Sequence, residues 1–304
     1  MQQAERNPTG RRWAVLLLAA PPALWLLAFL VLPYASLLVQ SFLSTDATGD
    51  VTFEPTLAPW RTLATRPLYV DTLLYTFQIA AAVTAVCVLI SVPLAYVIAF
   101  KVRRHKELLV TLITVPLWVS YIVRAYAWKI ILGREGILNT FLIYTGVVDQ
   151  PVEAFLYSPF ALVIGLVHIF TPFVLMPIYT ALEHIPRSLV EASQDLGAGR
   201  LTTFRRVVLP LALPGIMAGA TFAFVLTLGD FLAATLLGGP STLMIANVVQ
   251  NLFGTSDDRP LGSALGIAML ALVLAILTTT SRAERALSNG RRGLEVGRVG
   301  KVEP

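Results

Sequence analysis

Cysteine, histidine and charged side chains are all scarce in this sequence. Its 304 residues include one cysteine and three histidines, and only 13% of them are charged. The single cysteine, Cys87, excludes an intramolecular disulfide and any site built from several thiolates. The histidines are too widely spaced to give a recognisable set of metal ligands. We therefore expect neither a disulfide framework nor a metal site.

The motifs of nucleotide binding and hydrolysis are missing as well. The sequence has no Gly-x-x-x-x-Gly-Lys-Ser/Thr phosphate loop, no His-Glu-x-x-His zinc motif and no Gly-x-Ser-x-Gly nucleophile turn. These absences argue against a membrane enzyme. We expect no catalytic residues and no ATP site in this chain.

Long apolar runs, in contrast, are abundant. Hydrophobic residues make up 56% of the chain, and several runs reach the length of about 20 residues that crosses a bilayer as a helix. We expect an all-α polytopic membrane protein with one six-span domain over residues 13–281. The expected spans cover about residues 14–38, 72–100, 108–132, 160–182, 211–236 and 261–280. The third reaches full length only if it includes Arg124 and Lys129.

Positive charge is concentrated on alternate connections between these spans. The N-terminal segment 1–12, the connection after the second span, the loop 183–210 and the tail 282–304 hold 17 of the 23 lysines and arginines. The positive-inside rule therefore predicts that both termini and loop 183–210 are cytoplasmic. Because the positive charges lie on one side of the expected topology, we interpret the net charge of +5 as suited to anionic lipid rather than to nucleic acid.

Loop 183–210 contains an unusually polar stretch between two apolar segments. Pro186 suits the first turn of a short helix because its φ angle is fixed. Glu191 and Asp195, four residues apart, should share one face of that helix. Gly197 can end it in the left-handed conformation. We expect a second short helix, capped by Thr202 or Thr203, to follow. Such a helix–glycine–helix knob suits docking into a partner protein.

At this loop the chain resembles the six-span permease subunits of type I ABC importers. Their cytoplasmic signature is Glu-Ala-Ala, three residues, Gly, nine residues and Ile-x-Leu-Pro. Here it reads Glu191-Ala192-Ser193, then Gly197, then Val207-x-Leu209-Pro210, with Ser193 and Val207 as conservative departures. The resemblance implies a coupling helix that seats in an ATPase subunit. The coupling residues would be Glu191, Ala192, Ser193, Asp195, Gly197, Arg200, Leu209 and Pro210.

The same resemblance implies a set of partners and a location. Two ABC ATPase subunits would bind ATP and Mg²⁺, so this chain would hold no cofactor of its own. A second, homologous permease would complete the translocation pathway. A periplasmic or lipid-anchored binding protein would deliver the solute. The chain itself would be a multi-pass component of a bacterial inner (cytoplasmic) membrane.

Over most of residues 60–285 the chain is similar to the spermidine/putrescine branch of this family, and to its first type of permease. The matching segments are Val123–Trp128, Leu228–Phe231 followed by Leu236–Pro240, and Pro260–Leu265. This resemblance implies a polyamine solute. An organic acid, an amino-acid derivative or a phosphonate is the alternative within the same importer class. A stand-alone secondary carrier or channel is a remote alternative, since it would need several intramembrane carboxylates or an inverted repeat.

A polyamine pathway needs carboxylates and aromatic faces for its ammonium groups. Asp230 is the one acid expected well inside the membrane region, and Tyr121, Arg124 and Trp128 share a helical face at i, i+3 and i+7. The pathway candidates are Asp230, Tyr121, Arg124, Tyr126 and Trp128. Two structural alternatives remain open here. Arg124 and Lys129 could extend to the outer interface, and Asp230 could pair with Arg124 or with a cation of another subunit.

Overall fold

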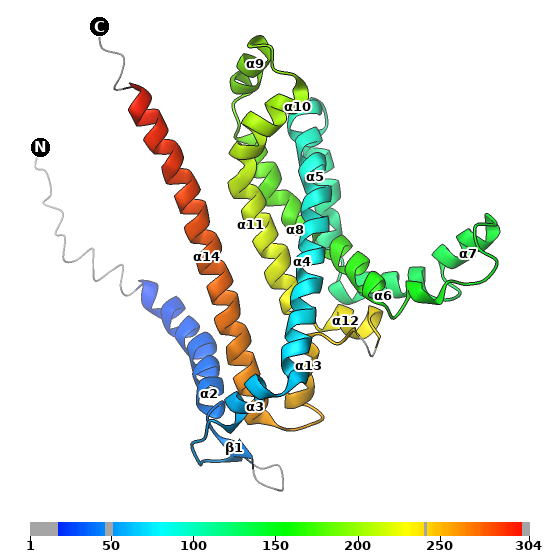
Figure 1. Ribbon diagram of the computed structural model, residues 1–304, viewed down its shortest axis with the longest axis vertical. Coiled ribbons are helices and arrows are strands. Elements are labelled where there is room, and N and C mark those ends of the chain that lie inside the picture. The colour runs from blue at the N-terminus through cyan, green and yellow to red at the C-terminus, as the bar shows by residue number, and fades with distance from the viewer. Residues whose placement is uncertain (1–17, 46–50, 240–241, 300–304) are drawn as a thin grey trace, which may run out of the picture. The chain divides into compact units, whose positions relative to one another are not determined.

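The computed structural model describes the backbone of residues 18–45, 51–239 and 242–299 (Figure 1). The expected N-terminal segment 1–12 and the expected start of the first span at residue 14 lie outside this part. The chain divides into two units, Met1–Arg66 with Asn251–Leu270, and Pro67–Gln250 with Ala271–Pro304, and each is described by itself.

The described residues are almost entirely helical. Five helices among them are long and apolar enough to cross a membrane, namely Leu18–Gln40, Pro67–Lys101, Pro159–Glu183, Arg200–Leu228 and Arg259–Arg282. Lys106–Trp118 and Tyr121–Tyr144 form a bent pair, with 91° between them, that gives a sixth span if it is counted as one. The predicted fold class, an all-α polytopic membrane protein, is therefore confirmed.

The first unit combines apolar helix with a small ribbon. Its elements are η1 (Leu27–Val31), α2 (Leu32–Gln40), β1 (Ser44–Thr45), β2 (Val51–Thr52) and α3 (Ala58–Thr65), together with the end of α13 (Ile245–Phe253) and the first part of α14 (Arg259–Val299). The strands are antiparallel, with Ser44 opposite Thr52. Asp258 Oδ1 accepts hydrogen bonds from Thr45 Oγ1 at 3.4 Å and from the Leu261 amide at 3.2 Å. One carboxylate thus joins the ribbon to the start of α14.

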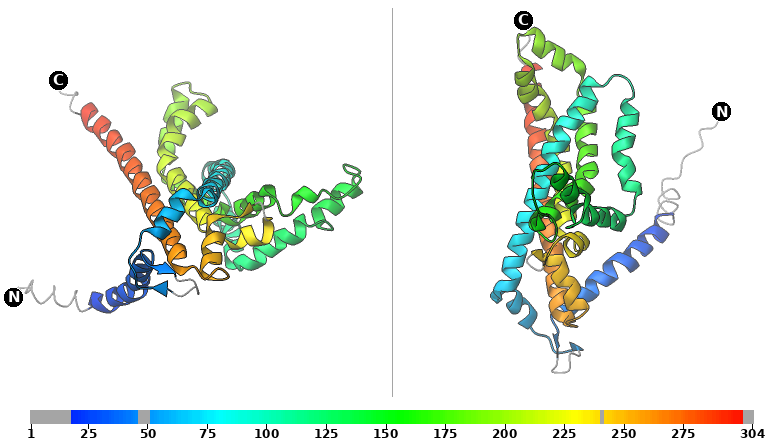
Figure 2. Two further views of the ribbon diagram at one scale, coloured as in Figure 1. Left: turned by 60° about the horizontal axis from the view of Figure 1, so that its bottom comes forward. Right: turned by 90° about the vertical axis from the view of Figure 1, so that its right-hand side faces the viewer.

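The second unit contains three long helices that pack on one another and several shorter ones. Its elements are α4 (Pro67–Tyr96), η2 (Val97–Lys101), α5 (Lys106–Thr114), η3 (Val115–Trp118), α6 (Tyr121–Leu132), α7 (Ile137–Tyr144), η4 (Glu153–Phe155), α8 (Pro159–Glu183), α9 (Arg187–Asp195), α10 (Arg200–Thr203), η5 (Phe204–Val208), α11 (Leu209–Leu228) and α12 (Leu232–Leu237). Helices α4, α8 and α11 lie side by side and enclose the core (Figures 1 and 2).

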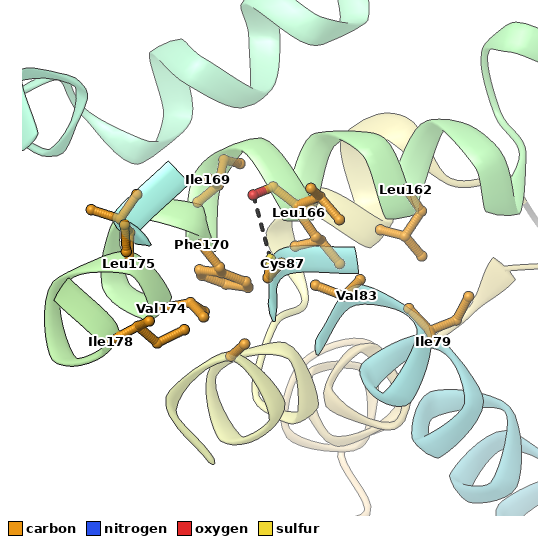
Figure 3. Packing of buried hydrophobic residues seen from close by; sticks show 14 of the residues in the cluster. Ile79, Val83, Cys87, Leu162, Leu166, Ile169, Phe170, Val174, Leu175 and Ile178 are labelled. Carbon is orange, nitrogen blue, oxygen red and sulfur yellow. Dashed lines mark hydrogen bonds between the residues drawn. The ribbon is translucent and has the colours of Figure 1, made fainter. Parts of the chain in front are cut away.

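Cys87 lies in the middle of this core, between α4 and α8 (Figure 3). Its side chain is fully buried with Val83 and Leu166. The thiol donates to the Val167 carbonyl at 3.6 Å and accepts a contact from Thr171 Oγ1 at 3.8 Å. A buried thiol of this kind packs as a small apolar group. The chain's single cysteine therefore contributes to packing between the two helices.

Two glycines let α11 approach α8 closely. A Cβ atom on Gly215 would lie 2.5 Å from the Pro177 carbonyl oxygen, and one on Gly219 would lie 2.8 Å from the Val174 carbonyl oxygen. The two glycines are one turn apart and so present a single flat stripe to α8. In hydrocarbon, where apolar surface gains little from burial, such close backbone contact is a main source of helix association.

The expected third span, 108–132, is broken rather than straight. Helix α5 ends at Thr114, a 3-10 turn covers Val115–Trp118, and Val119 is extended with φ −82° and ψ 136°. Pro116 lies in that turn, and a proline removes a backbone donor and clashes with the preceding turn. Helix α6 then leaves in a new direction. An apolar run alone does not reveal this bend.

The expected fifth span, 211–236, also ends early. Helix α11 stops at Leu228, Gly229 has φ −88° and ψ 0°, and α12 starts only at Leu232. Glycine is a poor helix former because it loses the most backbone freedom. After the sixth expected span, the backbone of α14 continues as helix through most of the tail, to Val299.

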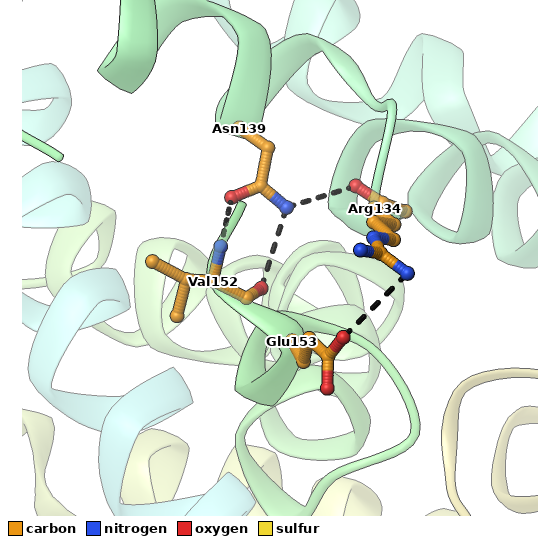
Figure 4. A network of polar contacts seen from close by, with 5 residues as sticks. Arg134, Asn139, Val152 and Glu153 are labelled. Atoms are coloured by element: carbon orange, nitrogen blue, oxygen red, sulfur yellow. Dashed lines mark hydrogen bonds and ion pairs between the residues drawn. The ribbon is translucent and has the colours of Figure 1, made fainter. Parts of the chain in front are cut away.

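Helices α6 and α7 form an arm that projects from the three-helix core (Figures 1 and 2). The buried Asn139 side chain fixes its fold (Figure 4). Its Nδ2 donates to the carbonyls of Gly133 at 3.1 Å and Val152 at 3.3 Å, and its Oδ1 accepts from the Val152 amide at 2.8 Å. Arg134 and Glu153 add an exposed ion pair at 3.7 Å. One amide thus sets the return of the chain towards α8.

We predict that Gly215→Val destabilises the protein, because the new side chain must displace the α8 backbone. Overpacking of this kind costs about 1–3 kcal/mol. The thermal midpoint of the detergent-solubilised protein and its yield in the membrane should both fall. Gly266→Val is the matched control, since a Cβ on Gly266 meets nothing within 4 Å. Equal midpoints for the two variants would contradict the close contact between α8 and α11.

Candidate coupling loop and substrate pathway

The first candidate site is loop 183–210, which joins α8 to α11 and which we call the coupling loop. It lies at the end of α11 opposite to α12 (Figure 1). Helix α8 ends at Glu183, and the buried Ile185 anchors the connection to the core. Pro186, with φ −58° and ψ 130°, then precedes α9, which begins at Arg187. The expected short helix is therefore present, and proline stands immediately before it.

Gly197 ends this helix as predicted. Its φ is +82°, in the left-handed region. The Gly197 amide donates to the Gln194 carbonyl at 2.9 Å, and the Ala198 amide donates to the Ser193 carbonyl at 3.1 Å. A Cβ on Gly197 would meet nothing within 4 Å. Glycine is required here for its conformation and not for lack of space.

The second helix of the loop differs from the expected one. It begins at Arg200 after Gly199, so neither Thr202 nor Thr203 is its cap. Thr203 is buried instead, and its Oγ1 lies 3.1 Å from Ser193 Oγ. This hydrogen bond joins α9 to α10. From Arg200 the helix runs without interruption to Leu228. The hydrogen bond and this helix together connect α9 to α11.

The surface of the loop carries both charged and apolar groups. Glu191, Ala192, Asp195 and Arg200 are all exposed, whereas Leu209 and Pro210 are half-buried in the first turn of α11. Two leucines stand beside the turn at Gly197, Leu196 with 89% of its surface exposed and Leu201 with 69%. These two leucines add exposed apolar surface to an otherwise polar loop. The sequence reasoning missed both, although a leucine next to a predicted turn was a usable signal.

The second candidate site lies at the break between α11 and α12. Asp230 is nine-tenths buried there. Its Oδ1 accepts a hydrogen bond from the Ala233 amide at 2.8 Å, and its Oδ2 accepts one from the hydroxyl of Tyr121, the first residue of α6. The carboxylate therefore caps α12 and connects it to α6. These contacts use both of its oxygens.

Arg124 lies one turn further along α6 and is also nine-tenths buried. Its Nη1 donates to the Ile169 carbonyl at 3.3 Å, and its Cζ lies 5.9 Å from the centre of the Tyr121 ring. The buried Nε has no hydrogen-bond partner. Among the described residues, no carboxylate oxygen lies within 4.0 Å of this guanidinium. The direct Arg124–Asp230 pair, one of the alternatives from the sequence, is therefore absent in this structure.

The remaining pathway candidates face different surroundings. Trp128 is half-buried and meets the His168 ring edge-on, with 5.6 Å between the ring centres. Tyr126 is exposed and lies 5.8 Å from Lys129 Nζ, which is 5.7 Å from the Tyr157 ring. Lys129 is thus stabilised by two aromatic faces. Tyr121 contacts both Asp230 and Arg124, whereas Tyr126 contacts Lys129.

Two polar residues that the sequence reasoning missed hold α12 and α13 in place. Asn247 Nδ2 donates to the Phe231 carbonyl and to Thr235 Oγ1, both at 2.9 Å, and its Oδ1 accepts from the Met244 amide at 3.2 Å. Thr76 Oγ1 on α4 accepts from the Ile245 amide at 2.9 Å. Asn247 reaches back to the start of its own helix, as the third residue of a capping box does. Methionine instead of serine or threonine at position 244 conceals that signal.

Known proteins resemble this chain in sequence and in fold. Residues 91–292 match the family described as binding-protein-dependent transport system inner membrane component. The spermidine/putrescine transport system permease protein PotB of Escherichia coli (strain K12) is 36% identical over 264 residues, which cover 87% of this chain and 95% of that protein. A putative 2-aminoethylphosphonate transport system permease of Salmonella typhimurium is 28% identical over 256 residues, or 84% of this chain and 89% of that protein.

The fold is also found in a solved ABC transporter. A crystal structure of a bacterial alginate ABC transporter, in complex with a periplasmic protein bound to an alginate pentasaccharide, superposes with a TM-score of 0.75. At 18% identity, the match covers 94% of this chain and 98% of that chain. The family match covers more than half of the sequence, and the described helices include several of membrane length. The chain belongs to the binding-protein-dependent transport system inner membrane components and is a multi-pass permease of the inner membrane.

Proposed function

We propose that this permease is one half of the translocation pathway of an ATP-driven importer. A second, homologous permease forms the other half. Two ABC ATPase subunits bind ATP and Mg²⁺, and a periplasmic or lipid-anchored binding protein delivers the solute. Both termini and the coupling loop face the cytoplasm, in agreement with the distribution of positive charge. This chain binds no nucleotide.

The coupling loop is the observation that carries this proposal. It presents a short helix closed by a left-handed glycine, with Glu191, Leu196 and Leu201 exposed at its surface. The Ser193–Thr203 hydrogen bond and the continuous helix behind it provide a stiff connection to α11. An exposed apolar and acidic knob fits a cleft in an ATPase. ATP-driven closure of the ATPases then moves α11.

We further propose a polyamine of the spermidine or putrescine type as the solute. The 36% identity to a permease of that name supports this choice. Asp230 supplies a buried carboxylate, and Tyr126 offers an exposed ring of the kind that attracts ammonium groups. A phosphonate, an organic acid or an amino-acid derivative is the second candidate. The buried Arg124, which has no counter-ion among the described residues, favours an anion.

We predict that Gly197→Pro and Glu191→Lys uncouple transport from ATP hydrolysis. Proline cannot adopt φ +82°, and lysine reverses a charge at the docking surface. In proteoliposomes containing the assembled importer, ATP-dependent uptake should fall at least about tenfold, or about 1.4 kcal/mol at 25 °C, while the variants still reach the membrane.

Two matched controls isolate the coupling loop from general damage. Gly146→Pro changes another left-handed glycine, with φ +70° and nothing within 4 Å of its Cβ, in the connection after α7. Asp149→Lys reverses an exposed charge in the same connection. Both should retain uptake. ATP-dependent uptake that stays normal in Gly197→Pro and Glu191→Lys would refute the coupling role.

Competition between labelled and unlabelled solutes for uptake tests which class of solute the importer carries. In the reconstituted importer with its binding protein, excess unlabelled spermidine should abolish ATP-driven uptake of labelled putrescine, because both present ammonium groups on an alkyl chain. Excess 2-aminoethylphosphonate should leave this uptake intact. Uptake of labelled 2-aminoethylphosphonate in place of putrescine would decide for the anionic candidate. Uptake by the purified chain alone, driven by an ion gradient, would instead indicate a secondary carrier.

A further inference from the structure

Helix α6 presents two groups that can bind the carboxylate of Asp230. Tyr121 is the first residue of α6, and Arg124 follows three residues later on the same face. The rise between them is about 4.5 Å along the helix axis. In this structure Asp230 bonds to Tyr121, whereas Arg124 has no acidic partner in the described part of the chain.

The positive charge of Arg124 is only partly compensated in this structure. Its side chain is nine-tenths buried, its Nη1 makes one long hydrogen bond of 3.3 Å, and its Nε makes none. A buried cation without a counter-ion is costly in an apolar environment. Asp230 is the candidate counter-ion, because the Tyr121 hydroxyl bonds to it and the Arg124 guanidinium lies 5.9 Å from the centre of the Tyr121 ring. A shift of α6 by about 4.5 Å along its axis, the rise from Tyr121 to Arg124, would bring Arg124 to the level that Tyr121 now occupies beside Asp230.

The positions of the neighbouring segments make such a movement possible. Asp230 lies between α11, which continues to the coupling loop, and α12, whose start it caps. Asn247 and Thr76 fix the segment beyond α12 to α4. The break at Gly229 therefore separates α11, which is connected to the coupling loop, from α12, which Asn247 holds in place. A movement of α11 relative to α12 would therefore change the position of Asp230, which lies between the two helices.

We propose that Asp230 exchanges its partner on α6, from Tyr121 to Arg124, when the importer changes state. The exchange rests on the proposed function, because ATP-driven movement of the coupling loop supplies the displacement. Tyr121 holds one state by a hydrogen bond, and Arg124 holds the other by an ion pair. Interfaces of packed helices commonly switch in steps of this size between two discrete arrangements. These three side chains, Asp230, Tyr121 and Arg124, are thus positioning residues. They transmit the movement of the coupling loop to α6.

The exchange predicts opposite effects of two substitutions on one equilibrium. Tyr121→Phe weakens the present arrangement, and Arg124→Gln weakens the exchanged one. A reporter cysteine is introduced as Phe231→Cys in a Cys87→Ala background, since the native thiol is the only one and the Phe231 side chain is 40% exposed. The rate of maleimide modification is measured in the reconstituted importer during ATP turnover. The two variants should shift this rate in opposite directions from the parent, each by about threefold or more, or about 0.65 kcal/mol.

Two further variants make the result specific. Arg124→Lys keeps a cation and should shift the rate less than Arg124→Gln. Val123→Ala changes an exposed neighbour on α6 and should leave the rate at the parent value. In an Asp230→Asn background, Arg124→Gln should shift the rate much less than it does in the parent, because the carboxylate that Arg124 would bind is gone. Shifts in the same direction, no shifts, or an undiminished effect of Arg124→Gln in the Asp230→Asn background would overturn the exchange.

Uptake by the parent separates this proposal from the proposed function. A parent that imports solute with ATP, but whose variants shift the reporter rate together or not at all, overturns the exchange alone. A parent without ATP-driven uptake overturns the proposed function. If the parent lacks uptake but the two variants still shift the reporter rate in opposite directions from it, the result supports the exchange as an equilibrium of the chain itself.

Discussion

Close backbone contact between α8 and α11 is the constraint on which the second unit depends. Within a bilayer the hydrophobic effect gives little reason for helices to associate, so packing must supply the attraction. Gly215 and Gly219 allow that packing by leaving no side chain between α11 and the carbonyls of α8. The contact fixes α11 along its length. The coupling loop precedes α11 and Asp230 follows it, so this one helix connects the two candidate sites.

The coupling loop could be predicted from the sequence, and the breaks in the spans could not. Gly197 and the spacing around it are local signals, because a left-handed turn depends on the residue that adopts it. A break such as the one at Gly229 depends on tertiary partners. Asp230 accepts its hydrogen bonds from Tyr121 and Ala233, and the first of these is more than a hundred residues away in sequence. Hydropathy describes both α11 and α12 as a single apolar run.

In the candidate pathway, too, the sequence indicated which residues to consider but not which side chains they contact. The helical spacing predicted Tyr121 and Arg124 on one face, and the Arg124 guanidinium does lie 5.9 Å from the centre of the Tyr121 ring. Asp230 is buried, and its place in a pathway stays a prediction. The sequence did not indicate which of the two residues Asp230 would bind. Nor did it indicate that Lys129 would lie between the rings of Tyr126 and Tyr157. Charges in an apolar segment are recognisable from sequence, whereas their partners depend on how the helices bend.

The uninterrupted helix from Arg200 to Leu228 also has a consequence for its fit to the bilayer. Its 29 residues span about 43 Å at 1.5 Å per residue, whereas the hydrocarbon layer is roughly 30 Å thick. Roughly 13 Å of helix must therefore lie beyond the hydrocarbon, or the helix must tilt. Arg205 and Arg206, both exposed in η5, occupy this excess length. Phosphate headgroups would hold the helix there, so lipid composition should influence the helix that continues from the coupling loop.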